Sequence, residues 1–188
     1  MNPGATDASA WSPGQFVRVD KSDPAPPEVC FNGQRVALLT KDWATPEGTD
    51  KFYPEETLSS FELPAIDASL SGGLKIHVSS QIVPLTVIVK AFDVIDQDGI
   101  PTHEAGLYIF DSETRDLGVV AGGDGLEIQL DEGLPREVSV VVVELSYGLS
   151  ASDLRRMPQY DMSWSNRASY GFRVAAGGVS SGDVPCAP

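Results

Sequence analysis

Basic residues, histidine and cysteine are all scarce in this sequence, and each scarcity narrows the possible functions. The 188 residues include 13 Lys and Arg against 27 Asp and Glu, which gives a formal net charge of −14. Nucleic acids and anionic membrane surfaces are bound through neutralising Lys and Arg side chains, so neither is expected as a partner. No apolar run approaches the roughly 18 residues that span a bilayer.

The two cysteines and the N-terminal residues bear on the cellular compartment in which the protein is made. Residues 1–7 lack both the basic segment and the apolar segment of a secretory signal, which predicts synthesis in the cytosol, with a mature secreted fragment as the alternative. In a reducing compartment, Cys30 and Cys186 are predicted to be free thiols, although a disulfide between them would join the two ends of the chain. Neither cysteine has the spacing of a metal ligand.

Apolar and polar residues alternate with a period of two over much of the chain, which predicts strands. The clearest strand covers residues 137–145 and contains four consecutive valines. One short helix is predicted over residues 150–157, opened by a serine cap and ended before Pro158. Further strands are predicted over residues 15–20, 35–40, 73–79, 83–92, 105–110, 117–121, 126–130 and 162–174.

This spacing of eight to ten short strands predicts an all-β fold, a β-sandwich or jelly roll. The apolar fraction of 41% is enough for a core. Residues 34–174 are predicted to form the sandwich domain. Residues 1–33, with five of the 14 prolines, are predicted to form an extended N-terminal arm, and residues 175–188 a C-terminal tail. Termini of this composition are ordered only when something ties them down.

A cluster of turn-forming residues at positions 96–99 is the most suggestive site for a metal. Asp96 and Asp98 precede Gly99 as in part of an EF-hand calcium loop, where carboxylate oxygens converge on the ion. Aligned on this glycine, the first ligand position falls on Val94 and the last on Ala105, so two fixed positions fail. The cluster is therefore interpreted as a hairpin tip, with a weak calcium site at Asp96 and Asp98 as the alternative.

The two histidines are candidates for acid–base chemistry. His77 alternates with apolar neighbours, so it is expected on the polar face of a strand, and His103 is expected in a loop beside Glu104. Neither is accompanied by a nucleophile motif, and both are interpreted as surface residues. No feature selects a pair among the 27 acidic residues, so a hydrolase is the least favoured alternative, and no enzyme is predicted.

Aromatic residues are the candidates for binding a partner. Trp11, Phe16 and Trp43 are predicted to do so, because Trp11 lies among Gly, Pro and Ser without a local core, and Trp43 lies in a polar stretch predicted to be irregular. Trp164 and Tyr170 fall at even spacing in one strand and so share a face. They are interpreted as core aromatics, with a sugar-binding platform as the alternative.

Together these features predict a non-enzymatic structural or assembly protein without a cofactor. Its arms are expected to bind protein subunits in a homo-oligomer or hetero-assembly. A virion component made in the host cytoplasm fits best, such as a capsid decoration protein or minor capsid protein of a tailed bacteriophage. The alternative is a secreted or surface β-sandwich module that binds carbohydrate or protein, with calcium at Asp96 and Asp98.

Overall fold

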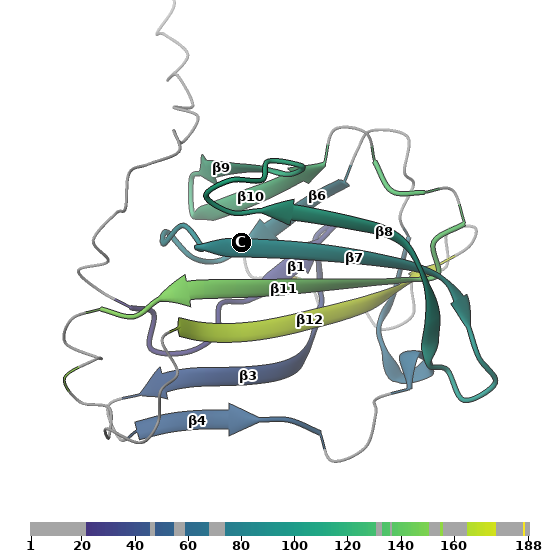
Figure 1. The fold of residues 1–188 in the computed structure, drawn as a ribbon, viewed down its shortest axis with the longest axis horizontal. Helices are drawn as coiled ribbons and strands as arrows, with labels where there is room; N and C mark the ends of the chain where they lie inside the picture. The colour runs from purple at the N-terminus through teal and green to yellow at the C-terminus, as the bar shows by residue number, and fades with distance from the viewer. Residues whose placement is uncertain are drawn as a thin grey trace, which may run out of the picture.

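The computed structural model describes residues 22–45, 48–54, 59–67, 74–130, 133–135, 137–150, 155, 165–175 and 186. Within these residues the chain forms twelve strands and one 3-10 turn (Figure 1). The elements are β1 (Val29–Phe31), β2 (Gln34–Arg35), β3 (Ala37–Thr45), β4 (Gly48–Phe52), η1 (Ser60–Glu62), β5 (Ala65–Asp67), β6 (Leu74–Val78), β7 (Thr86–Ile95), β8 (Pro101–Phe110), β9 (Gly118–Gly122), β10 (Gly125–Leu130), β11 (Val140–Gly148) and β12 (Ser165–Ala175).

These strands form two antiparallel sheets packed against each other, which confirms the predicted β-sandwich. The smaller sheet has the order β2-β1-β6-β10-β9. The larger sheet has the order β4-β3-β12-β11-β7-β8, and β5 adds to it by pairing in parallel with β12. The larger sheet lies in front of the smaller one in Figure 1. The strand count exceeds the predicted eight to ten, because β2, β4 and β5 are short and carry little apolar alternation.

The core lies between the two sheets, and strand β11 runs through its centre with a partner on each edge. Its alternate residues Val141, Val143 and Leu145 are buried, as expected when successive side chains point to opposite faces of a sheet. The ring of Phe31 in the smaller sheet stacks on Phe172 in the larger, with centroids 4.8 Å apart. The valine-rich segment is therefore a central strand, as its composition indicates.

Trp43 is the clearest departure from the predicted layout. Its side chain is 1% exposed, packs edge-on against Tyr147, and donates its indole N–H to the carbonyl of Asp23 at 2.9 Å. Because the ring is in the core, it is not available to bind a partner. The polar stretch around it forms strands β3 and β4, where Lys41 pairs with Asp50 across the two strands. The charged residues of such cross-strand ion pairs make the sequence of a strand as polar as that of a loop.

The segment preceding β2 also packs more closely than an arm would. Val29 is fully buried, β1 pairs with β6, and the hydroxyl of Tyr170 donates to the carbonyl of Pro27 at 2.6 Å. The described part of the predicted arm, residues 22–33, thus belongs to the sandwich.

Several predictions fall on residues that the structure does not describe. Residues 1–21, with Trp11, Phe16 and the predicted strand 15–20, lie outside the described residues. So does most of the predicted helix 150–157, and so does Trp164. In the described part of the chain, no helix has the length and apolar character needed to cross a membrane.

The Tyr170 hydroxyl gives a first test of the core. We expect Tyr170→Phe to lower the free energy of unfolding at pH 7 by about 1–2 kcal/mol, because the buried Pro27 carbonyl loses its donor. Burial raises the pKa of Tyr170, so its neutral form stabilises the fold below about pH 10, and that contribution is lost as the pH rises further. Guanidinium denaturation at neutral and alkaline pH measures both effects, and the variant should lose stability less steeply above pH 10.

Tyr53→Phe is the matched control, because Tyr53 is 58% exposed. A Tyr170→Phe variant as stable as the wild type at pH 7 contradicts the role assigned to this hydrogen bond.

Candidate functional site

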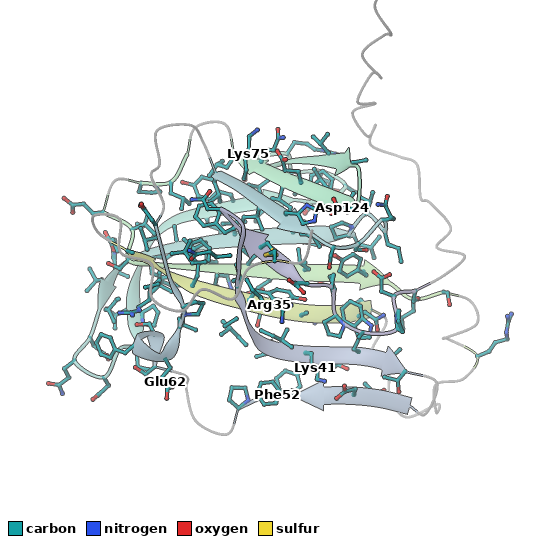
Figure 2. All side chains as sticks on the ribbon, turned by 180° about the vertical axis from the view of Figure 1, so that it is seen from behind. Arg35, Lys41, Phe52, Glu62, Lys75 and Asp124 are labelled. Atoms are coloured by element: carbon teal, nitrogen blue, oxygen red, sulfur yellow. A yellow bond between two sulfur atoms is a disulfide. The ribbon has the colours of Figure 1, made fainter. Side chains whose placement is uncertain are left out.

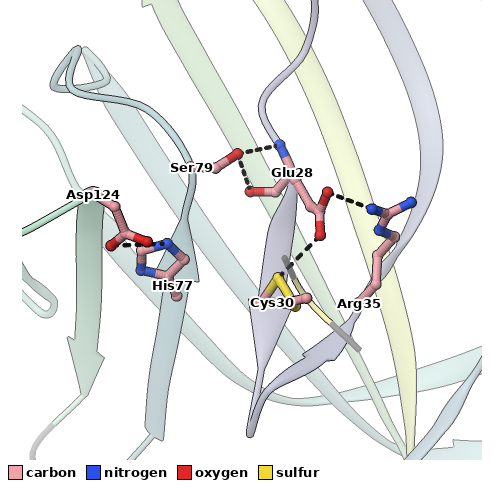
Figure 3. The surroundings of a disulfide bond; sticks show 7 residues. Glu28, Cys30, Arg35, His77, Ser79 and Asp124 are labelled. Atoms are coloured by element: carbon pink, nitrogen blue, oxygen red, sulfur yellow. Dashed lines mark hydrogen bonds and ion pairs between the residues drawn. A yellow bond between two sulfur atoms is a disulfide. The ribbon is translucent and has the colours of Figure 1, made fainter. Parts of the chain in front are cut away.

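A disulfide on the outer face of the smaller sheet marks the candidate site. Cys30 lies in β1 between two residues of the core, Val29 and Phe31, so its side chain points to the opposite, outer face. It is nevertheless only 4% exposed, because Cys186 bonds to it and covers it. The Cys186 N–H also donates to the carbonyl of Gly33 at 3.0 Å. The C-terminal segment is thus tied to the smaller sheet at this point (Figure 3).

The prediction that both cysteines are free thiols is wrong. The two residues are 156 positions apart, with Cα atoms 6.3 Å from each other. No local sequence pattern indicates that two residues so far apart in the chain are close in space. The prediction relied on the compartment, and the pairing follows from where β1 and the C-terminal segment lie in the fold.

Polar side chains from three strands surround the disulfide. His77 in β6 lies directly opposite Cys30, and Glu127 in β10 lies directly opposite His77. The Lys75 ammonium lies 3.4 Å from the Glu127 carboxylate. A shallow pocket of about 170 Å³ opens between these groups. It is lined by Cys30, Asn32, Gly33, Lys75, His77, Glu127 and Cys186.

Glu28 places a carboxylate against the sulfur atoms. It is two residues before Cys30, so it shares the outer face, and its Oε1 lies 3.6 Å from Cys30 Sγ. Its Oε2 accepts a hydrogen bond from the Arg35 guanidinium. Its backbone is fixed by Ser79, whose Oγ accepts from the Glu28 N–H at 2.8 Å and whose N–H donates to the Glu28 carbonyl at 2.9 Å. The Glu28 side chain is therefore held at its carboxylate by Arg35 and at its backbone by Ser79.

His77 faces the polar side of its strand, as predicted, and its side chain is half-buried beside a neighbouring hairpin. Its Nε2 lies 3.8 Å from the carboxylate of Asp124, which belongs to the two-residue turn between β9 and β10. A Cβ atom at Gly125 would come within 2.9 Å of the imidazole and 2.2 Å of the Val78 carbonyl. Glycine at this position thus allows the hairpin to lie directly against the histidine.

His103 does not join this site. The prediction that it lies in a loop is wrong, because it belongs to strand β8 of the larger sheet. Its Nδ1 lies 2.7 Å from the Asp93 carboxylate in the neighbouring strand β7, and its side chain is 64% exposed. Since His77 is in the smaller sheet, the two histidines do not form one catalytic set.

The turn at residues 96–99 is a hairpin tip whose oxygens are engaged by the protein. Asp96 Oδ1 accepts hydrogen bonds from the backbone N–H groups of Asp98 at 2.9 Å and Ile100 at 2.8 Å. The carbonyl of Asp98 accepts from the Ser59 hydroxyl at 2.8 Å. Gly99 has φ +82°, and a Cβ there would meet the Ser59 Oγ at 2.1 Å. The turn is therefore docked on the segment before η1.

Within the described residues, potential metal ligands converge in another place. The donor atoms of Glu28, Cys30 and Cys186 all lie within 4.8 Å of one another. The sequence signal for this cluster was weak: two cysteines, one of them with a carboxylate two residues away on the same face of a strand. Arg35, Lys75 and Glu127 lie near this cluster only because of the register of their strands.

The fold and this site define an all-β, two-sheet sandwich whose C-terminal segment is fastened to the smaller sheet by a disulfide. Comparison with protein-family models, with curated proteins and with solved structures finds no match.

The disulfide should make a large contribution to stability. For a loop of 156 residues, the chain-entropy account gives about 5 kcal/mol, so we expect reduction to lower the free energy of unfolding by about 3–5 kcal/mol. Denaturation with and without a dithiol reductant measures the loss. A Cys30→Ser, Cys186→Ser double variant is the control and should not respond to the reductant. Two alkylated thiols in the unreduced, native protein would contradict the bond.

The hairpin tip predicts a different response to substitution and to calcium. We expect Asp96→Ala to lower the free energy of unfolding by about 1–2 kcal/mol, because two backbone N–H groups lose their acceptor. Asp98→Ala keeps both of those hydrogen bonds and should cost less. Thermal melts with and without calcium complete the test. A rise in Tm on adding calcium that both variants abolish would contradict the hairpin-tip interpretation.

Proposed function

We propose that the protein is a non-enzymatic structural component that binds other protein subunits through the β4 edge of its larger sheet. The observation that carries this proposal is a set of exposed apolar side chains beside an edge strand. Leu38 is 39% exposed, Phe52 43% and Tyr53 58%. Phe52 lies on β4 and Leu38 on β3, while Tyr53, which donates its hydroxyl to Asp42, lies on the opposite face of the sheet from Phe52. Exposed aromatic side chains such as that of Phe52 are enriched where proteins contact one another.

The arrangement of the sheets explains why these side chains are uncovered. Phe52 lies two residues from Asp50, which is directly opposite the buried Trp43, so Phe52 points toward the core side of the larger sheet. Strands β3 and β4 extend past the smaller sheet, and Figure 2 shows Phe52 and Lys41 at this margin. The core side of the larger sheet therefore ends in an uncovered apolar margin.

The backbone of β4 offers a second means of binding. Among the described residues, β4 pairs with β3 only, so β4 is an edge strand of the larger sheet. An extended segment of another chain adds to such an edge through main-chain hydrogen bonds. The charged residues Asp50 and Lys51 limit non-specific pairing, as charges commonly do on edge strands.

In this proposal the N-terminal segment, residues 1–21, is an arm that binds a neighbouring subunit, with Trp11 and Phe16 as its anchors. A virion component suits these features, such as a capsid decoration or minor capsid protein made in the host cytoplasm. The disulfide supports a particle that works in oxidising surroundings, where such bonds persist. The virion assignment itself rests on the analogy between sandwiches with arms and the small subunits of assembled shells.

The disulfide also favours a second candidate, a secreted or surface module that binds carbohydrate or protein. Its binding site would be the pocket beside the bond, whose lining includes Asn32, Lys75, His77 and Glu127. These side chains offer both donors and acceptors for a polar ligand.

Self-association measured by light scattering tests the first candidate. We expect the wild-type chain to form an oligomer, Phe52→Asp to weaken it at least tenfold, and deletion of residues 1–21 to weaken it as well. The deletion should stop at residue 21, because β1 and the residues just before it are part of the sandwich. Leu107→Asp is the matched control, since Leu107 is 45% exposed on β8 at the opposite edge of the same sheet.

A wild-type chain that stays monomeric at millimolar concentration contradicts self-association through β4. Binding to a glycan or protein panel that Lys75→Ala abolishes and Phe52→Asp preserves would favour the second candidate.

A further inference from the structure

We propose that the protein has a second, dithiol state in which Glu28, Cys30 and Cys186 bind one zinc ion. The disulfide of the present structure is then the oxidised state of a metal site. This inference concerns the outer face of the smaller sheet and does not depend on the assembly role of the β4 edge.

The positions of the donor atoms carry the inference. The carboxylate oxygen of Glu28 and both sulfur atoms lie within 4.8 Å of one another. Bonds of about 2.3 Å to sulfur and about 2.1 Å to oxygen place the donors of a tetrahedral zinc site roughly 3.3–3.8 Å apart. Once the sulfur–sulfur bond is broken, small rotations of the two cysteine side chains reach that spacing. The backbones already hold the Cα atoms 6.3 Å apart.

Glu28 has the surroundings of a metal-binding carboxylate. Its Oε1 faces Cys30 Sγ, while its Oε2 accepts a hydrogen bond from Arg35. Carboxylates that bind metals are themselves commonly hydrogen-bonded through their other oxygen, which fixes their orientation. The backbone contacts between Glu28 and Ser79 hold the residue at this position. No other described element has to move to present the oxygen to an ion between the sulfurs.

His77 is the candidate for the fourth ligand. It is directly opposite Cys30, and Cβ atoms of such pairs lie about 4.5–5.5 Å apart. In the oxidised structure the His77 imidazole is turned toward Asp124, with Nε2 3.8 Å from the carboxylate (Figure 3). Rotation of the imidazole toward the sulfurs completes a set of two sulfurs, one nitrogen and one oxygen.

The pocket supplies access to the sulfur atoms, and the donor atoms beside it suit zinc. The opening of about 170 Å³ is lined by both cysteines and by His77, so an ion reaches the sulfurs without unfolding of the sheet. Two thiolates and one carboxylate favour zinc over calcium or magnesium, which prefer sites made only of oxygen.

The disulfide state and the zinc-bound state interconvert by the gain and loss of two electrons. A dithiol such as dithiothreitol gives two electrons and two protons to the Cys30–Cys186 bond and is itself oxidised to a cyclic disulfide. Zinc then displaces the two thiol protons, which pass to the buffer. In the reverse direction, a disulfide such as oxidised glutathione takes two electrons from the metal-bound thiolates and two protons from the buffer, leaves as two thiols, and releases the zinc as the Cys30–Cys186 bond re-forms. In both states, Cys186 stays attached to β1.

Metal titration of the full-length chain tests the proposal. The oxidised protein and the protein reduced with dithiothreitol and desalted under nitrogen are each titrated with zinc against a chromogenic chelator. Cobalt serves as a second probe, because thiolate ligands give it intense absorption bands. We expect the reduced protein to bind one equivalent with thiolate bands, and the oxidised protein to bind at least 100-fold more weakly. Zinc should also raise the Tm of the reduced protein alone.

Variants identify the ligands. Cys186→Ser should abolish the thiolate-rich cobalt spectrum, and Glu28→Gln and His77→Gln should each weaken zinc binding at least tenfold. Arg35→Gln should weaken it by roughly 10–100-fold, as expected for the loss of a partner that orients a ligand. Glu127→Gln is the matched control, because this carboxylate lines the same pocket outside the donor cluster, and it should bind zinc normally.

Three results would overturn the proposal. The first is zinc binding of equal strength in the oxidised and reduced proteins, which would assign it to surface carboxylates of this acidic chain. The second is a reduced protein that keeps its β-sheet circular dichroism and binds no zinc. The third is a Cys186→Ser variant with unchanged affinity and an unchanged cobalt spectrum.

Discussion

The rest of the structure depends on one constraint. The apolar inner face of the larger sheet must be buried. Strands β11 and β12 present a continuous apolar surface that includes Val143, Leu145 and Phe172, and the smaller sheet buries it. Strand β1 is essential to that cover, because Phe31 stacks directly on Phe172. The N-terminal residues that carry β1 are therefore committed to the core, and the disulfide forms on the other side of the same strand.

The unequal widths of the two sheets account for the two surfaces of interest. Where the smaller sheet covers the larger one, its own outer face is free to carry the polar groups around Cys30 and His77. Where it ends, the margin at β4 leaves Phe52 uncovered. The proposed zinc site and the proposed subunit contact thus belong to different sheets, and substitutions in one should leave the other intact.

Alternation in the sequence was enough to predict the sandwich, because burial on one face of a strand leaves a period of two in the residues themselves. Strands β6 and β10 follow this rule, and β11 was predicted from its run of four valines. Strand β4 was missed, because its sequence, GTDKF, has no apolar alternation. The candidate site was missed for another reason: Glu28, His77, Glu127 and Cys186 meet only through strand register and a bond across 156 residues, and neither leaves a local pattern.

The position of the disulfide also determines how the molecule responds to a pulling force. Tension applied between the two ends of the chain passes along the N-terminal segment to Cys30, crosses the sulfur–sulfur bond and leaves through Cys186. The whole stretch between the two cysteines, which includes every strand from β2 to β12, lies outside this load path. Strands β2 to β12 are therefore shielded from mechanical unfolding while the bond is intact, and reduction would transfer the load to the hydrogen bonds of the sheets.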